Sequence, residues 1–258
     1  MEVMEARKVS SGYGWMWIKQ GYWLFKKSPV LWIVLTALCV VGMFALNMIP
    51  LLGDPLSTLV FPGLLAGLML GCHALAKGEQ LELPHLFSGF KQHAHKLITL
   101  GGINLVGQLL ILGVVKVTGG SALVDVMVSG NPADEAVLRQ ALAGTGFAVA
   151  LGATLFTMLL MAMQFAPMLV VFRKITPVAA MRASLRACLL NFMPLTVYGL
   201  LLLPFGVCAT LPWMMGWPLL LPVIVCSLYA IYRDLFPMEE DMVPPAAEAA
   251  PVTDSPAP

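Results

Sequence analysis

Six long apolar runs constrain this chain more than any other feature. A helix needs about 20 apolar residues to cross the hydrocarbon core of a membrane, and the runs reach that length. They cover residues 29–52, 56–76, 97–118, 144–172, 192–211 and 214–232. Four prolines, Pro204, Pro212, Pro218 and Pro222, interrupt the last two runs, and membrane helices tolerate proline where neighbouring groups satisfy the backbone. The sequence therefore predicts an all-α integral membrane protein with six transmembrane helices.

Composition excludes the main classes of water-soluble protein. Apolar residues make up 59% of the 258 residues and charged residues 11%, against about 45–50% and about 25% in soluble domains. Those values exclude a soluble enzyme, a disordered chain and a nucleic-acid binder with a basic face. The five cysteines form no C-x-x-C pair, so we interpret them as free thiols in the apolar interior.

The positions of Lys and Arg predict how the chain lies in the membrane. Thirteen of the fifteen fall in segments on one side of the six runs, and only Lys116 and Arg139 fall on the other. Basic residues concentrate on the cytoplasmic side of membrane proteins. We therefore expect a multi-pass protein of the bacterial inner (cytoplasmic) membrane with both termini in the cytoplasm.

Three short basic segments precede the odd-numbered runs. Residues 11–27, 83–97 and 177–190 each place apolar side chains on one helical face and basic or polar ones on the other. Such helices lie in the headgroup plane of a membrane. The predicted architecture is therefore three transmembrane hairpins, each preceded by a basic amphipathic interfacial helix. In the first of these segments we expect the apolar face to carry Trp15, Trp17, Ile18, Tyr22, Leu24 and Phe25.

Three regions follow along the chain. Residues 1–28 form a cytoplasmic amphipathic segment, residues 29–236 the six-span membrane domain, and residues 237–258 a tail. The tail has five acidic residues, no basic ones and many Pro and Ala, a composition typical of disorder. In the loop before the fourth run, Asn131 and Pro132 fit the cap and first turn of a helix.

Several stretches resemble a family of bacterial inner-membrane proteins, chiefly from beta-proteobacteria. They are residues 4–29, 67–91, 164–194 and 228–236, of which 164–194 reads QFAPMLVVFRKITPVAAMRASLRACLLNFMP. The resemblance implies a six-span membrane protein with no assigned activity. The 164–194 pattern is also loosely similar to the membrane part of some glycerophosphodiester phosphodiesterases. Their soluble catalytic domain has no counterpart in this sequence, so the resemblance implies no activity.

Small residues on two of the runs predict close helix packing. Gly63, Gly67 and Gly71 form a G-x-x-x-G-x-x-x-G stripe on the second run, and small residues let helices approach closely in lipid. The fourth run offers a matching stripe at Gly144, Ala148 and Gly152. We expect the two stripes to face one another or a second copy of the chain; a ligand groove is the alternative.

Three carboxamide side chains fall inside the runs. Asn104 and Gln108 lie four residues apart on the third run, and Gln164 lies on the fourth. Buried polar groups in a membrane form interhelical hydrogen bonds or line a substrate path. The first interpretation predicts a structural role, whereas the second predicts a small-solute transporter or permease subunit.

The sequence contains no convincing motif for catalysis or metal binding. His85, His93 and His95 share one loop without metal-ligand spacing, and Glu79 and Glu82 with His85 fit a solvated loop better than an acid–base site. Cys188 lies two residues after Arg186, and a nearby cation can lower the pKa of a thiol. A lowered pKa of Cys188 or acylation of this thiol is therefore an alternative. We predict no enzyme activity, no catalytic residues, no metal and no cofactor.

The strongest functional feature is a set of eight basic residues at the expected cytoplasmic ends of the runs. This basic set consists of Lys26, Lys27, Lys91, Lys96, Arg173, Lys174, Arg182 and Arg186. Each basic residue near an anionic leaflet gains about 1 kcal/mol. The set either fixes topology alone or binds anionic lipid headgroups, with Arg182 and Arg186 as the core. We predict a non-enzymatic protein that organises anionic lipid or partner membrane proteins, which include a second copy of itself.

Overall fold

The computed structural model describes residues 6–129, 139, 141–211 and 213–237, and all regular structure in these residues is helical. The helices are α1 (Tyr13–Lys26), α2 (Pro29–Asn47), α3 (Gly53–Ala76), α4 (His85–Val115), the π-helical turn η1 (Lys116–Gly120), α5 (Ser121–Ser129), α7 (Gly146–Gln164), α8 (Ala166–Phe172), α9 (Pro177–Leu190), α10 (Phe192–Thr210) and α11 (Trp217–Leu235). The helix start expected at Asn131 and the tail beyond Pro237 lie outside the described residues.

Six segments are long and apolar enough to cross a membrane, as predicted. They are Pro29–Asn47, Gly53–Ala76, His93–Val126, Gly146–Phe172, Phe192–Thr210 and Trp217–Leu235. Proline occupies the first turn of α2, where its missing N–H costs no helical hydrogen bond. Pro62, Pro204 and Pro222 lie inside helices that continue past them. Apolar length therefore determines these elements more strongly than the helix-breaking tendency of proline.

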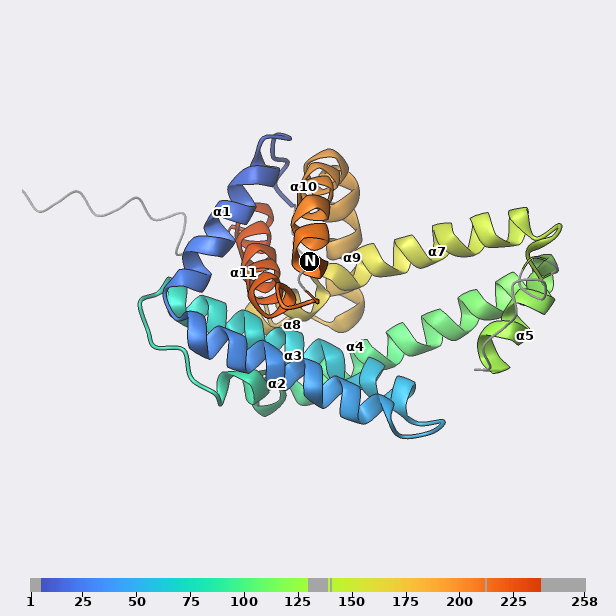
Figure 1. Cartoon of the computed structure of the whole chain (residues 1–258), viewed down its shortest axis with the longest axis horizontal. Helices are drawn as coiled ribbons and strands as arrows, with labels where there is room; N and C mark the ends of the chain where they lie inside the picture. The colour runs from blue at the N-terminus through green and yellow to red at the C-terminus, as the bar shows by residue number, and fades with distance from the viewer. Residues whose placement is uncertain (1–5, 130–138, 140, 212, 238–258) are drawn as a thin grey trace, which may run out of the picture.

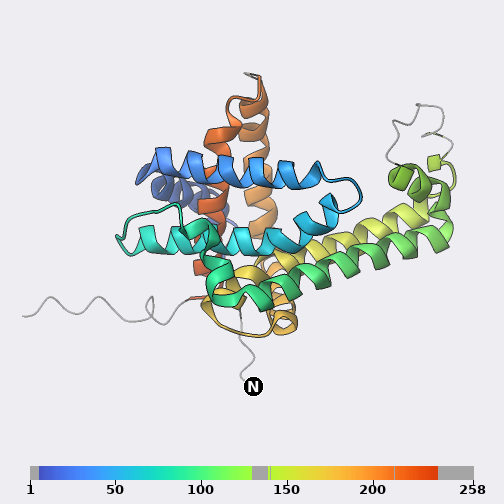
Figure 2. The same cartoon turned by 90° about the horizontal axis from the view of Figure 1, so that it is seen from below.

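Spans that follow one another in the sequence lie side by side, but the three pairs are not aligned. Helices α2 and α3 pack together, as do α4 and α7, and α10 and α11 (Figure 1). In Figure 2 the α10–α11 pair runs across the direction of α2 and α3, while α4 and α7 extend away together toward α5. The structure thus differs from a simple row of three hairpins, because the short helices pack between the pairs.

Helix α1 packs into the fold with a face that differs from the predicted one. Trp17 and Leu24 are buried as expected, whereas Trp15 and Tyr22 are 50% and 53% exposed. The face is completed by Gly21, where a Cβ atom would lie 2.6 Å from the backbone nitrogen of Ser227 in α11. Glycine allows this close crossing, which rotates the helix so that Trp15 and Tyr22 point outward.

The predicted segment at 83–97 is the beginning of α4. Its backbone leaves helical geometry at His93, with φ −138° and ψ 28°. Before this kink the segment lies along the α3 glycines. A Cβ atom at Gly67 would lie 2.1 Å from the carbonyl oxygen of Leu86, and one at Gly63 would lie 2.1 Å from the Cζ atom of the Phe90 ring. This segment therefore packs lengthwise against a span.

The two small-residue stripes do not face one another within the chain. Gly63 and Gly67 on α3 face α4, as just described, and the α7 residues meet a different part of α4. A Cβ atom at Gly152 would lie 2.4 Å from the Val115 side chain, and Ala148 lies near Gly120. Gly144 has φ +78° and lies in the turn before α7. Gly63, Gly67 and Gly152 therefore each pack closely against α4, which contacts both α3 and α7.

The most buried region lies where α3, α8 and α11 end. Helix α8 is buried along almost its whole length. An aromatic cluster joins the three helix ends, with ring centroids 5.2 Å apart for His73 and Phe172 and 5.4 Å apart for Phe172 and Tyr232. Trp17 of α1 closes the cluster by donating its indole N–H to Asp234 at 2.7 Å. This packed end carries most of the basic set.

Candidate functional site

Three residues of the basic set hold the packed end together. The Lys27 ammonium donates to the Leu75 carbonyl at 2.8 Å, at the end of α3, and lies 4.3 Å from the centroid of the Trp23 ring. The Lys96 ammonium donates to the Lys174 carbonyl at 2.7 Å, and the Arg173 guanidinium donates to the Pro237 carbonyl. Cations stabilise the carbonyl ends of helices, so these three residues have a structural role.

The other five residues of the set expose their side chains. They are Lys26, Lys91, Lys174, Arg182 and Arg186. The Lys26 ammonium lies 5.8 Å from the centroid of the Tyr22 ring. In the described part of the chain, neither Arg182 nor Arg186 has an ion-pair or hydrogen-bond partner within the protein. These guanidinium groups are therefore available to an external anion.

Hydrogen bonds on the buried face of helix α9 fix the orientation in which Arg182 and Arg186 are exposed. Its opposite face carries the fully buried Ser184, whose hydroxyl donates to the Met161 carbonyl at 2.7 Å and accepts the N–H of Phe165 at 3.0 Å. The Ser184 hydroxyl thus bridges the Phe165 N–H and the Met161 carbonyl, two groups that would pair directly in a continuous helix, where α7 ends and α8 begins. The bonds therefore fix the side of α9 that faces outward.

The outward face of α9 combines basic and apolar groups. Val178 is 49% exposed and Leu189 is 54% exposed, on the same helix as Arg182 and Arg186. Helix α1 has a comparable surface, on which Trp23 is 62% exposed beside exposed lysines. Basic residues next to exposed aromatic and aliphatic ones are typical of helices at a membrane surface.

The Cys188 thiol is not an activated nucleophile. It lies on the buried face of α9, with 2% of its surface exposed, and its Sγ is 3.5 Å from the Met161 carbonyl oxygen. Burial raises the pKa of this thiol to about 12, although the hydroxyl of Ser184 acts in the opposite direction. The lowered pKa considered from the sequence is therefore wrong, because Arg186 points away from Cys188 toward the exposed face.

Two of the three predicted intramembrane carboxamides line one cavity. Asn104 of α4 and Gln164 of α7 contribute to a cavity of about 400 Å³, whose other walls come from α2, α3, α8 and α11. Gln108, one turn beyond Asn104, is not among the described residues that line it. Within the described residues neither Asn104 nor Gln164 makes a hydrogen bond to another residue. The interhelical hydrogen bonds predicted for these carboxamides are thus absent among the described residues.

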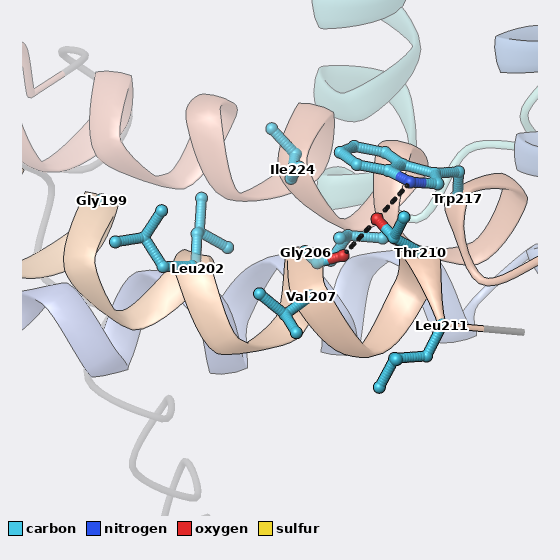
Figure 3. A pocket seen from close by; sticks show the side chains of 10 residues that line it. Gly199, Leu202, Gly206, Val207, Thr210, Leu211, Trp217 and Ile224 are labelled. Carbon is cyan, nitrogen blue, oxygen red and sulfur yellow. Dashed lines mark hydrogen bonds between the residues drawn. The ribbon is translucent and has the colours of Figure 1, made fainter. Parts of the chain in front are cut away.

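An apolar groove separates α10 and α11 (Figure 3). Its volume is about 740 Å³ and its lining is almost entirely aliphatic. At one end the Trp217 indole donates to the Thr210 hydroxyl at 3.2 Å, which in turn donates to the Gly206 carbonyl at 2.9 Å. The sequence did not predict this groove. Two glycines on α10, Gly199 and Gly206, leave space there.

The imidazole of His85 contacts the backbone of the preceding turn. The Nδ1 atom of His85 lies 3.0 Å from the Glu82 amide nitrogen and 3.1 Å from the Glu82 carbonyl oxygen. In the residues that the structure describes, no group of three His, Cys, Asp or Glu side chains could hold a metal ion. Elsewhere, Lys116 and Asp125 form an ion pair at 2.9 Å on an exposed surface.

Comparison with known proteins supports the membrane assignment. No family model matches the chain, and no solved structure matches it. The chain is 28% identical over 264 aligned positions to a protein of Burkholderia thailandensis described as a "probable inner membrane protein", with 93% of this chain and 97% of the relative covered. Together with six helices long enough to span, this similarity supports a multi-pass inner-membrane protein.

Proposed function

We propose that the protein is a non-enzymatic inner-membrane protein that binds anionic lipid headgroups through the exposed part of its basic set. The carrying observation is on α9, where Arg182 and Arg186 are exposed beside exposed aliphatic residues while Ser184 fixes the opposite face. Guanidinium groups pair with phosphate oxygens in a bidentate geometry. Two of them, four residues apart, lie on one helical face.

The proposal places α1 and α9 at the level of the cytoplasmic headgroups. Trp15, Tyr22 and Trp23 are half or more exposed on α1, and aromatic rings of this kind concentrate at membrane interfaces. With these helices at the interface, both termini face the cytoplasm and all six spans cross. Bound lipid then covers the α9 surface, or connects it to a second copy or to another membrane protein.

The test is mass spectrometry of the protein purified with its native lipids, in which wild type is compared with Arg182→Gln/Arg186→Gln. Two headgroup contacts of about 1 kcal/mol each correspond to a loss of anionic lipid of about tenfold or more. The control is Lys116→Gln, which also removes a positive charge. Lys116 follows the C-terminal end of α4 and does not belong to the basic set, so this variant should retain the wild-type lipid. Equal anionic lipid in the double variant would contradict the proposal and leave Arg182 and Arg186 as topology signals.

A further inference from the structure

The cavity at Asn104 and Gln164 lies at mid-depth in the spans that surround it. Thr36 and Val40 are central in α2, Phe61 and Leu65 are central in α3, and Asn104 lies well inside the span that begins at His93. The cavity therefore opens to the hydrocarbon region and not to either aqueous side. A molecule that fills it must partition into the bilayer.

The lining determines the chemistry of that molecule. None of the described lining residues is charged, and aliphatic side chains make most of the wall. An ionised group would be costly to bury there without a partner. The polar groups are the Asn104 and Gln164 carboxamides, each of which offers two N–H donors and one carbonyl acceptor. Neither makes a hydrogen bond within the described residues.

A backbone acceptor lies at the same wall. Pro167 has no N–H, so the Met163 carbonyl lacks its usual i+4 donor, and both residues line the cavity. The side-chain hydroxyl of Thr36 is already used, since it donates to the Trp32 carbonyl at 2.8 Å. The free hydrogen-bonding capacity is thus concentrated where α7 meets α8.

The cavity reaches the outer surface between α2, α3 and α7. Val40, Phe61 and Leu160 line it and are 50%, 49% and 50% exposed. An apolar chain can therefore enter sideways from the bilayer, without passing through the packed end of the molecule.

We propose that this cavity binds an uncharged amphiphile, an apolar chain that carries ester carbonyl or hydroxyl oxygens, with those oxygens at Asn104 and Gln164. The ligand class follows from two unpaired carboxamides in an apolar, uncharged and laterally open cavity. This site is separate from the exposed arginines of α9 and does not depend on them.

Photolabelling in nanodiscs tests the proposal. The probe is a monoacylglycerol whose acyl chain carries a diazirine and an alkyne, and the comparison probe is an alkane with the same two groups. In wild type the monoacylglycerol labels residues 36–40 and 160–167. Loss of two intramembrane hydrogen bonds in Asn104→Leu/Gln164→Leu lowers this labelling about five- to tenfold, whereas Gln108→Leu and alkane labelling stay at wild-type levels.

Monoacylglycerol labelling of the double variant at the wild-type level would overturn the proposal, because the carboxamides would then contribute nothing to binding. Should the double variant not fold, the wild-type map decides by itself. Labels concentrated on the lining residues support the site, whereas labels spread evenly over the lipid-facing residues overturn it.

Discussion

Replacing Gly67 by Ala is expected to destabilise the protein by about 3 kcal/mol or more. A Cβ atom there would lie 2.1 Å from the Leu86 carbonyl oxygen and 2.7 Å from that of His85. Both contacts are with backbone atoms, so no side-chain rotation can relieve them. The first part of α4 must move away from α3, and the cavity wall and the packed end move with it. The midpoint of thermal unfolding in detergent measures the loss.

Gly42→Ala is the matched control for this substitution. Gly42 also lies inside a span, α2, but a Cβ atom there would meet no other described atom within 4 Å. Alanine is the better helix former by up to about 1 kcal/mol, so this variant should unfold at the wild-type temperature or above it. Equal shifts for the two variants would show that α3 and the start of α4 do not pack as described.

Asn191→Ala is expected to cost about 3 kcal/mol and to release the segment before α1. Asn191 is fully buried between α9 and α10. Its Oδ1 accepts the Val9 N–H at 2.9 Å, and its Nδ2 donates to the carbonyls of Arg7 and Ala187 at 3.0 and 3.1 Å. Each buried polar group left unsatisfied costs about 1–3 kcal/mol. Amide hydrogen exchange of residues 6–12 should accelerate together with the drop in unfolding temperature.

Two further variants serve as comparisons for Asn191→Ala. Asn47→Ala removes an exposed amide that bonds only to the Met43 carbonyl of its own helix, and surface changes of this kind stay within about 0.5 kcal/mol. Asn191→Asp keeps the acceptor for Val9 but buries a carboxylate whose second oxygen faces the Arg7 and Ala187 carbonyls, so it should destabilise the protein at least as much as Asn191→Ala. Unchanged exchange of residues 6–12 in Asn191→Ala would contradict the described attachment.

The sequence predicted the elements of this fold well. The span expected at 192–211 corresponds to Phe192–Thr210, and the segment expected at 177–190 is α9, Pro177–Leu190. These bounds follow from apolar length and from proline at a helix start, which are local properties. The identity of neighbouring helices is not a local property. Gly63 and Gly67 indicated close packing, but nothing in their spacing indicated the start of α4 as the partner.

For the candidate sites, too, the sequence indicated which residues matter but not which groups they contact. All eight basic residues could be named from the sequence, yet only the structure separates Lys27, Lys96 and Arg173, which hold carbonyl groups, from the exposed Arg182 and Arg186. The transporter interpretation grouped Asn104, Gln108 and Gln164. The structure brings Asn104 and Gln164 to one cavity, beside the break at Phe165 that separates α7 from α8.

Binding of anionic lipid at α9 requires that the basic side of the protein face the cytoplasm, and cysteine labelling measures this most directly. In a Cys208→Ser background, a membrane-impermeant maleimide is applied to spheroplasts that carry Leu51→Cys or Thr176→Cys. Both positions are exposed, one in the turn between α2 and α3 and one at the start of α9. Leu51→Cys should label in intact spheroplasts and Thr176→Cys only after permeabilisation. Labelling of Thr176→Cys from outside would contradict the orientation and the lipid site built on it.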